Sequence, residues 1–195
     1  MKLTRREFAA IAVGELIGAA GIAGFVVGGC NAAGVWSEIE TWLPKGIASF
    51  EAIVTLVDPI ASPTIVAAAE LVRAGFAVLS AAVDQYIAAP AADKATFLGK
   101  VQTAFTAVTQ NINQFLAAIG QSAKPIVKLA VALATIILST IEGFMQQIGP
   151  APVPATLRVG AETVTVAPVQ RNKKTFIADF NAACVAGGHP ELSIR

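Results

Sequence analysis

Residues 72–86, VRAGFAVLSAAVDQY, decide the fold because their large apolar side chains return every three or four positions. These side chains step by four, three, four and three residues: Val72, Phe76, Leu79, Val83 and Tyr86. This heptad spacing predicts a helix that packs lengthwise against other helices. Ser62 and Pro63 fit its start, as N-cap and first residue, and Ala89–Pro90 fits its end.

The next segment predicts a second long helix, which begins near Ala92 or Asp93. Its apolar stripe consists of Phe97, Val101, Ala104, Val108, Ile112, Phe115 and Ile119. Its opposite face is polar and carries little charge: Lys100, Thr103, Thr106, Gln110, Asn113 and Gln114. This pattern is typical of a bundle helix with one buried side. Gly120 is a natural residue for the position after its end.

Residues 129–141, LAVALATIILSTI, are thirteen residues without a charge, and they predict a third long helix that begins near Ser122. Thirteen residues are too few to cross a bilayer unaided. We therefore expect a central bundle helix that is buried on nearly all sides. The alternative is a hairpin that inserts into lipid, as in pore-forming or lysis proteins.

An earlier amphipathic segment covers residues 35–43, and we expect Pro44 to break or kink it. Its stripe contains two tryptophans, Trp36 and Trp42. Indole rings are common at membrane interfaces, where the N–H group stays hydrated. The two side chains are therefore candidates for a membrane interface; the alternative is that they cap the bundle core.

In the C-terminal part, the spacing of the apolar residues changes from a helical period to alternation. Pro150, Pro152 and Pro154 predict a stiff spacer. Alternating apolar residues on both sides of Gly160–Ala161 then predict a β-hairpin, which must lean on the bundle or pair with another chain. Arg171, Lys173 and Lys174 form a basic cluster, expected to be solvated or to contact lipid headgroups. It precedes a last helix over residues 175–185.

These patterns predict a mainly α protein: an antiparallel bundle of three to four long helices, a small C-terminal β-hairpin and a final short helix. We expect three regions. Residues 1–29 form an export signal or signal anchor, residues 30–149 the helical bundle, and residues 150–195 the spacer, hairpin and last helix.

The composition excludes a nucleic-acid binder. The chain has 14 basic and 13 acidic residues, of which residues 1–29 hold three and two, so the remainder carries 11 of each sign. A neutral chain has no basic field to attract phosphates. Only 14% of the residues are charged and 55% are hydrophobic. A surface this poor in charge tends to associate, so we expect a protein partner, a homo-oligomer or contact with lipid.

The first thirty residues combine a basic start, an apolar run rich in glycine, and small residues where a signal peptide would be cleaved. The segment around Arg5, Arg6 and Phe8 resembles the twin-arginine export signal of bacteria. Val27, Gly28, Gly29 and Cys30 resemble the lipobox of bacterial lipoproteins. This resemblance covers residues 1–30 and implies cleavage before Cys30, with diacylglycerol on its sulfur. It implies a protein anchored in a membrane on the periplasmic or cell-surface side.

The alternative is an uncleaved signal anchor, because the apolar run is long enough to span a bilayer. The second cysteine, Cys184, is expected as a buried apolar residue of the last helix. If lipidation fails, a disulfide between Cys30 and Cys184 is the competing hypothesis.

The sequence shows no constellation that predicts catalysis, and we expect no catalytic residue, cofactor or metal. The chain has one histidine, His189, next to a proline near the C-terminus. Glu38 and Glu40 are two residues apart and do not share a helix face. Five further acids are scattered single residues, expected to be solvated or to cap helices: Glu51, Asp58, Glu70, Asp84 and Glu142. We expect Glu70 to pair with Arg73 three residues later.

The sequence therefore favours a non-enzymatic, exported and membrane-anchored bundle that acts as a structural or binding module in an envelope or surface assembly. The alternatives are a membrane-active protein that forms pores or remodels lipid, and a carrier with an apolar pocket for a small ligand.

Overall fold

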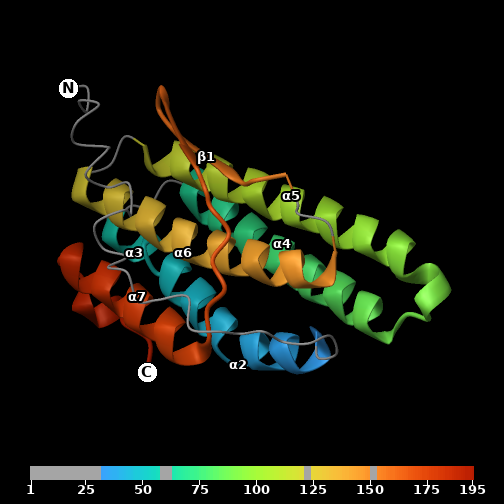
Figure 1. Cartoon of the computed structure of the whole chain (residues 1–195). Coiled ribbons are helices and arrows are strands. Elements are labelled where there is room, and N and C mark those ends of the chain that lie inside the picture. Colours follow the sequence, from blue (N-terminus) through green and yellow to red (C-terminus); the bar gives the residue numbers. More distant parts are fainter. Residues whose placement is uncertain (1–31, 58–62, 121–123, 150–152) are drawn as a thin grey trace. The chain divides into compact units, whose positions relative to one another are not determined.

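The computed structural model describes residues 32–57, 63–120, 124–149 and 153–195, and the part from Ala32 to Arg195 forms one compact unit. The predictions for residues 1–29 and for Cys30, and those for Ser62, Ser122, Pro150 and Pro152, lie outside these ranges. Four long helices dominate the unit (Figure 1): α2 (Ala32–Glu51), α4 (Pro63–Ala88), α5 (Lys94–Ile119) and α6 (Lys124–Ile148).

The shorter elements also follow the expected order. The helical turn α3 (Val54–Val57) follows α2, and the 3-10 turn η1 (Ala91–Asp93) joins α4 to α5. The C-terminal part contains β1 (Thr156–Val159), β2 (Glu162–Thr165), α7 (Lys173–Ala186) and η2 (Pro190–Leu192). The predicted class, a mainly α bundle with a small β-hairpin and a final short helix, is confirmed.

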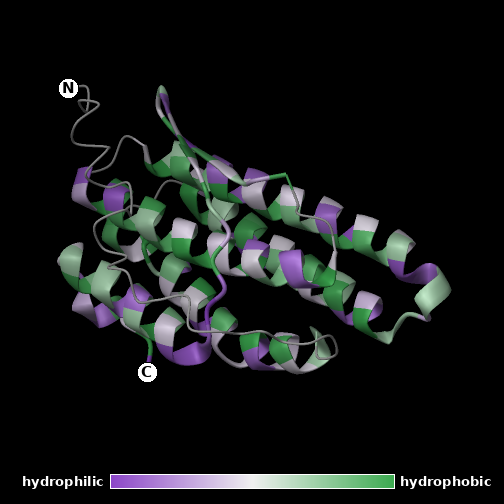
Figure 2. Cartoon of the chain, in the orientation of Figure 1, coloured by the Kyte–Doolittle hydropathy of each residue, from purple (hydrophilic) through white to green (hydrophobic). Residues whose placement is uncertain are grey.

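Helices α4 and α5 pack as an antiparallel pair. Val72, Leu79 and Val83 of the heptad stripe are buried, and Asn111 of α5 donates a hydrogen bond to the backbone carbonyl of Leu71, at 2.8 Å. Gly75 allows the close approach, because a Cβ atom there would lie 2.7 Å from the Asn111 amide. Figure 2 shows hydrophobic and hydrophilic residues alternating along α5, as expected for a helix with one buried side.

Helix α6 is the central helix of the bundle. Every residue from Ile136 to Met145 is buried, and Leu133, Ile137 and Leu138 have no exposed surface. This confirms the expectation of a helix buried on nearly all sides. Among the described helices, α4 and α6 are long and apolar enough to cross a membrane by length and composition, a test that the core helix of a soluble protein also passes.

Helix α2 corrects one expectation. Of the break or kink expected at Pro44, the break does not occur, because the helix runs through Pro44 from Ala32 to Glu51. Proline removes a helical N–H donor and strains the preceding turn. The buried side chains Trp42 and Leu43 before it and Ile47 after it belong to the same core. We attribute the continuity of α2 to this burial on both sides of the proline.

The β-hairpin packs against the bundle. This is one of the two arrangements expected for it, the other being pairing with another chain. Strands β1 and β2 are antiparallel, with Leu157 opposite Val164, and Gly160 has the positive φ of 61° that the turn needs. β1 lies along α5 (Figure 1), where the Asn113 amide binds two backbone groups of the strand. It donates to the carbonyl of Thr156 at 2.8 Å and accepts from the N–H of Arg158 at 2.7 Å.

Candidate functional site

A groove lies between α2 and α4. Its volume is about 340 Å³, and its floor is almost entirely apolar. The apolar lining comes from both helices and consists of Trp36, Leu43, Pro44, Ile47, Phe76 and Leu79, with Ala48 and Ala77 at its sides. A few polar side chains complete the lining: Glu40, Glu51, Arg73 and Ser80. A concave apolar surface with a few polar groups is typical of a ligand site.

The polar groups meet across the groove in antiparallel register. Glu51 of α2 binds Arg73 of α4, and Glu40, three turns earlier on α2, accepts a hydrogen bond of 2.6 Å from Ser80. One turn further, Trp36 of α2 lies near Asp84 of α4, but its buried indole Nε1 has no hydrogen-bond partner among the described residues. The two helices therefore present facing partners at successive levels along the groove.

One end of the groove is electrostatically balanced. The Arg73 guanidinium contacts Glu51 through Nε and through a terminal nitrogen, which lies 2.6 Å from Oε2. Glu51 is 9% exposed, whereas the Arg73 side chain is 71% exposed, so the arginine covers the carboxylate from the solvent side. The predicted pair of Arg73 with Glu70 is corrected, because Glu51, 22 residues earlier, takes this role.

The other end is acidic. Within the described ranges, neither Glu40 nor Asp84 forms an ion pair with a basic side chain. Partial burial raises the pKa of the Asp84 carboxyl, and the nearby charge of Glu40 raises it further, while the Trp36 N–H acts in the opposite direction. Glu40 therefore lines this end of the groove, and Asp84 lies outside the lining but near enough for the charge of Glu40 to act on it.

The structure corrects the expectation of a membrane interface at Trp36 and Trp42. Both are core residues, 3% and 1% exposed, so this fold presents neither indole to a lipid surface. Trp36 packs on Phe144 with ring centroids 4.9 Å apart, and Trp42 packs on Phe176 at 4.3 Å. Their burial agrees with the alternative, a place in the bundle core, and Trp36 also lines the groove.

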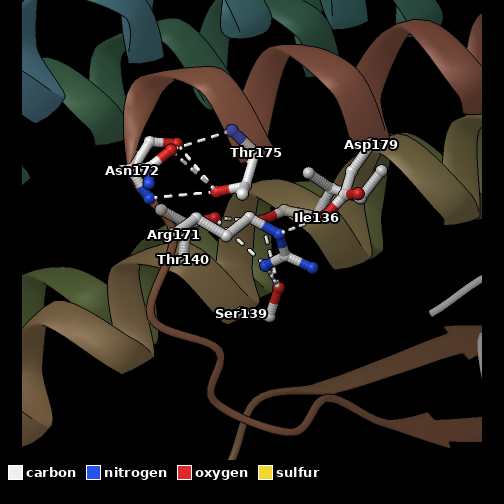
Figure 3. A network of polar contacts seen from close by, with 7 residues as sticks. All are labelled: Ile136, Ser139, Thr140, Arg171, Asn172, Thr175 and Asp179. Carbon is white, nitrogen blue, oxygen red and sulfur yellow. Dashed lines mark hydrogen bonds and ion pairs between the residues drawn. The ribbon is translucent and has the colours of Figure 1, made fainter. Parts of the chain in front are cut away.

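The expectation for the basic cluster at the start of α7 is corrected in part. Lys173 and Lys174 are exposed, but the Arg171 side chain is only 3% exposed. Its guanidinium binds Asp179 at 2.8 Å and Ser139 at 2.5 Å (Figure 3). Arg171 is therefore neither solvated nor available to lipid headgroups. It fixes the start of α7 to the middle of α6.

The same part of α6 binds the segment that leads into and out of the hairpin. Glu142 accepts a hydrogen bond from the backbone N–H of Ala155, and the backbone carbonyl of Ser139 accepts one from Val169, at 2.8 Å. The chain passes so close that a Cβ atom on Gly143 would lie 2.4 Å from the Val169 carbonyl oxygen. Residues 139–143 thus form a binding site for the chain's own C-terminal segment.

The remaining candidates do not come together as a reactive site. Cys184 is fully buried, which confirms its place in the core, and burial raises the pKa of its thiol to about 11. His189 contacts Glu191 at 2.8 Å near the C-terminus. No group of three or more potential metal ligands occurs among the residues that the structure describes.

Comparison of the chain with protein-family models, with curated proteins and with solved structures finds no match. The groove therefore has to be interpreted from its own residues. Sequence reasoning missed it because its lining comes from two helices. A usable signal was present, however, since Glu40 and Glu51 interrupt the apolar stripe of α2 at helical spacing.

Proposed function

We propose that this protein is an exported, membrane-anchored binding module of a bacterial envelope or surface assembly, and that the α2–α4 groove holds the apolar part of its ligand. The observation that carries the binding role is the groove itself. Its volume of about 340 Å³ lies at the lower end of the range of ligand pockets, and its floor is apolar. A small amphiphile or the end of a lipid chain fits this size and chemistry.

Two features support the export and the anchor. The N-terminal residues resemble a twin-arginine signal followed by a lipobox, so Cys30 would be the attachment point. Two acyl chains hold a protein stably at a membrane, where one would be marginal. A binding site on a tethered domain is then kept close to the lipid or assembly that supplies its ligand.

Contacts that hold the groove and the C-terminal segment in place support a binding role. Arg171 and Glu142 fix the C-terminal segment to α6, and the Glu51–Arg73 pair joins the two helices of the groove. A groove with walls fixed in this way needs little ordering on binding, which favours affinity. The low surface charge leaves a protein partner or a homo-oligomer as a further expectation.

Native mass spectrometry of the full chain released from its own membranes tests this function. We expect cleavage before Cys30, the mass of the acyl chains, and a non-covalent companion of lipid-like mass. Ala77→Phe fills the groove and should remove the companion. Ala74→Phe, on the same helix and outside the groove lining, should retain it. A companion that survives in Ala77→Phe, or its absence from the unmodified protein, would contradict the binding role.

A second candidate function is membrane activity, favoured by one observation. Helix α4 is apolar enough to span a bilayer, and it exposes Leu71 and Val78, which are 47% and 60% exposed. Dye leakage from liposomes separates the two functions. A binding module leaves the vesicles intact, whereas a pore-forming or lipid-remodelling protein releases the dye.

A further inference from the structure

The two ends of the α2–α4 groove differ in charge, although its floor is uniformly apolar. At one end Arg73 neutralises Glu51 through two nitrogens. At the other end Glu40 and Asp84 lie close enough for the charge of one to act on the other. Within the described ranges no basic side chain pairs with either of them.

We infer that the groove selects an amphiphile with a cationic head, whose apolar chain lies along Leu43, Ile47 and Leu79 and whose head lies at Glu40. This inference rests on the proposed function of the groove as a binding site and adds the chemical class of its ligand. An ammonium or a substituted amine is the head that the acidic end fits.

Glu40 is positioned to bind such a head. Ser80 donates a hydrogen bond of 2.6 Å to its Oε1, which fixes the carboxylate at the mouth of the groove between the two helices. Its other oxygen makes no hydrogen bond within the described residues, and the side chain remains exposed. A cationic group at the mouth can therefore reach an oriented carboxylate without displacing a protein partner.

Asp84 adds a second negative charge one helical turn beyond Ser80. The pKa of Asp84 is raised because its charged form is partly buried and faces the charge of Glu40. A cation bound at Glu40 would weaken this repulsion, although Asp84 itself lies outside the groove lining. The acidic end therefore gains a favourable interaction only when the ligand brings a positive charge.

An anionic head has no comparable place in the groove. The guanidinium of Arg73 is the only basic group in the described lining, and it is bound to Glu51. An anion could use only the guanidinium N–H groups that Glu51 leaves free, next to a carboxylate that already balances the charge of Arg73, or would lie beside Glu40. The groove consequently discriminates against a ligand such as a fatty acid or a sulfate ester by like-charge repulsion.

Photo-crosslinking of the full chain in nanodiscs of zwitterionic lipid tests the inference. Three dodecyl probes carry the same diazirine in the chain and differ only in the head: trimethylammonium, hydroxyl or sulfate. The readout is the crosslinking yield on peptides that line the groove, divided by the crosslinking yield on the rest of the chain. This ratio cancels differences in how strongly each probe partitions into the lipid. We expect the ratio for the ammonium probe to exceed that for the hydroxyl probe by about threefold or more.

Two variants assign the preference to the acidic end. Glu40→Gln should bring the labelling ratio of the ammonium probe down to that of the hydroxyl probe, and continued labelling of Leu43, Ile47 and Leu79 by the hydroxyl probe shows that the groove is intact. Glu38→Gln is the matched control, an exposed acid on the same helix and outside the groove lining, and it should have no effect.

The outcomes separate the inference from the function on which it rests. Equal ratios for the three heads, or a preference for sulfate, would overturn the cationic selectivity while the groove remains a binding site. If none of the three probes labels the groove, both the selectivity and the proposed function fail.

Discussion

Glu142 of α6 accepts a hydrogen bond from the backbone N–H of Ala155, thirteen residues later in the chain, and both groups are buried. The Glu142 side chain is 1% exposed, and its Oε2 has no hydrogen-bond partner among the residues that the structure describes. Burial raises the pKa of this carboxyl, and the Ala155 N–H offsets part of the rise. The acid thus joins α6 to the hairpin segment and also makes the stability of the fold depend on pH.

We predict that the contribution of Glu142 to the free energy of unfolding decreases as the pH rises from its ordinary pKa of 4.5 through its raised pKa. In this window the folded state holds a proton that the unfolded chain has released, so the unfolded chain is favoured by rising pH. The loss is about 1.4 kcal/mol for each unit by which the pKa is raised. Urea unfolding of the wild type and Glu142→Gln across this range measures it.

The difference between the two proteins isolates Glu142, since Asp84 also has a raised pKa and titrates in both. The stability of the wild type relative to Glu142→Gln should fall with rising pH. A difference that is flat, or that rises with pH, would show that the buried carboxyl does not titrate as its surroundings require.

We predict that Gly143→Ala destabilises the fold although it places a better helix former in α6. The added Cβ would lie 2.4 Å from the Val169 carbonyl oxygen and 2.9 Å from the Gln170 nitrogen. Both are backbone atoms, which cannot relieve the contact by changing rotamer as a side chain could. We expect a net loss of about 1–3 kcal/mol in the free energy of unfolding. Thermal and urea unfolding measure it.

Gly99→Ala is the matched control for this substitution. Gly99 lies in α5, and a Cβ there meets nothing within 4 Å. The change should therefore raise stability by about 0.5–1 kcal/mol. If both alanines stabilise the protein, the segment at Val169 does not pass over α6 as closely as described.

We predict that Arg171→Ala lowers the free energy of unfolding by about 2–4 kcal/mol. The substitution leaves Ser139 and Asp179 without their shared partner; Asp179 is 40% exposed, so water compensates part of its loss. Hydrogen exchange should show that α7 loses protection first. Lys173→Ala, an exposed neighbour, should change stability by less than about 0.5 kcal/mol. Equal effects of the two substitutions would mean that the Arg171 contacts contribute little.

We predict that the Cys184 thiol does not react with a thiol reagent until the protein unfolds. The side chain is fully buried, and its pKa of about 11 leaves almost no thiolate at neutral pH. With an acylated Cys30, the native chain should show no fast thiol and the denatured chain a single one. A fast native thiol would contradict lipidation, and no thiol after denaturation would support the disulfide with Cys184.

The long helices could be predicted from the sequence because their apolar spacing depends only on neighbours one or two turns away. The stripe that contains Val72 and Leu79 is buried as expected, and so is the stripe of α5 around Val108. The polar residues could not be placed by the same reasoning. Glu142 was expected to be solvated or to cap a helix, yet it lies in the core because its partner comes from the segment before β1.

The ion pair of the groove could not be predicted from spacing within one helix either. Glu51 was expected to be solvated or capping, and Arg73 to pair with Glu70, because spacing within one helix was the available information. The actual pair of Glu51 with Arg73 depends on the antiparallel contact of α2 and α4, which is a tertiary property. Local rules predicted a break or a kink at Pro44, and the break does not occur because the buried face of α2 continues through the proline.

The central claim is that the α2–α4 groove binds an apolar chain, and the position of a bound probe tests it most directly. The full chain in zwitterionic nanodiscs is labelled with the dodecyl diazirine probe that carries a hydroxyl head, and the labelled residues are mapped by mass spectrometry. We predict that the label concentrates on groove residues such as Leu43, Ile47 and Leu79, and that Ala77→Phe removes it. Label centred instead on the exposed face of α4 at Leu71 and Val78, and unchanged by Ala77→Phe, would contradict the account.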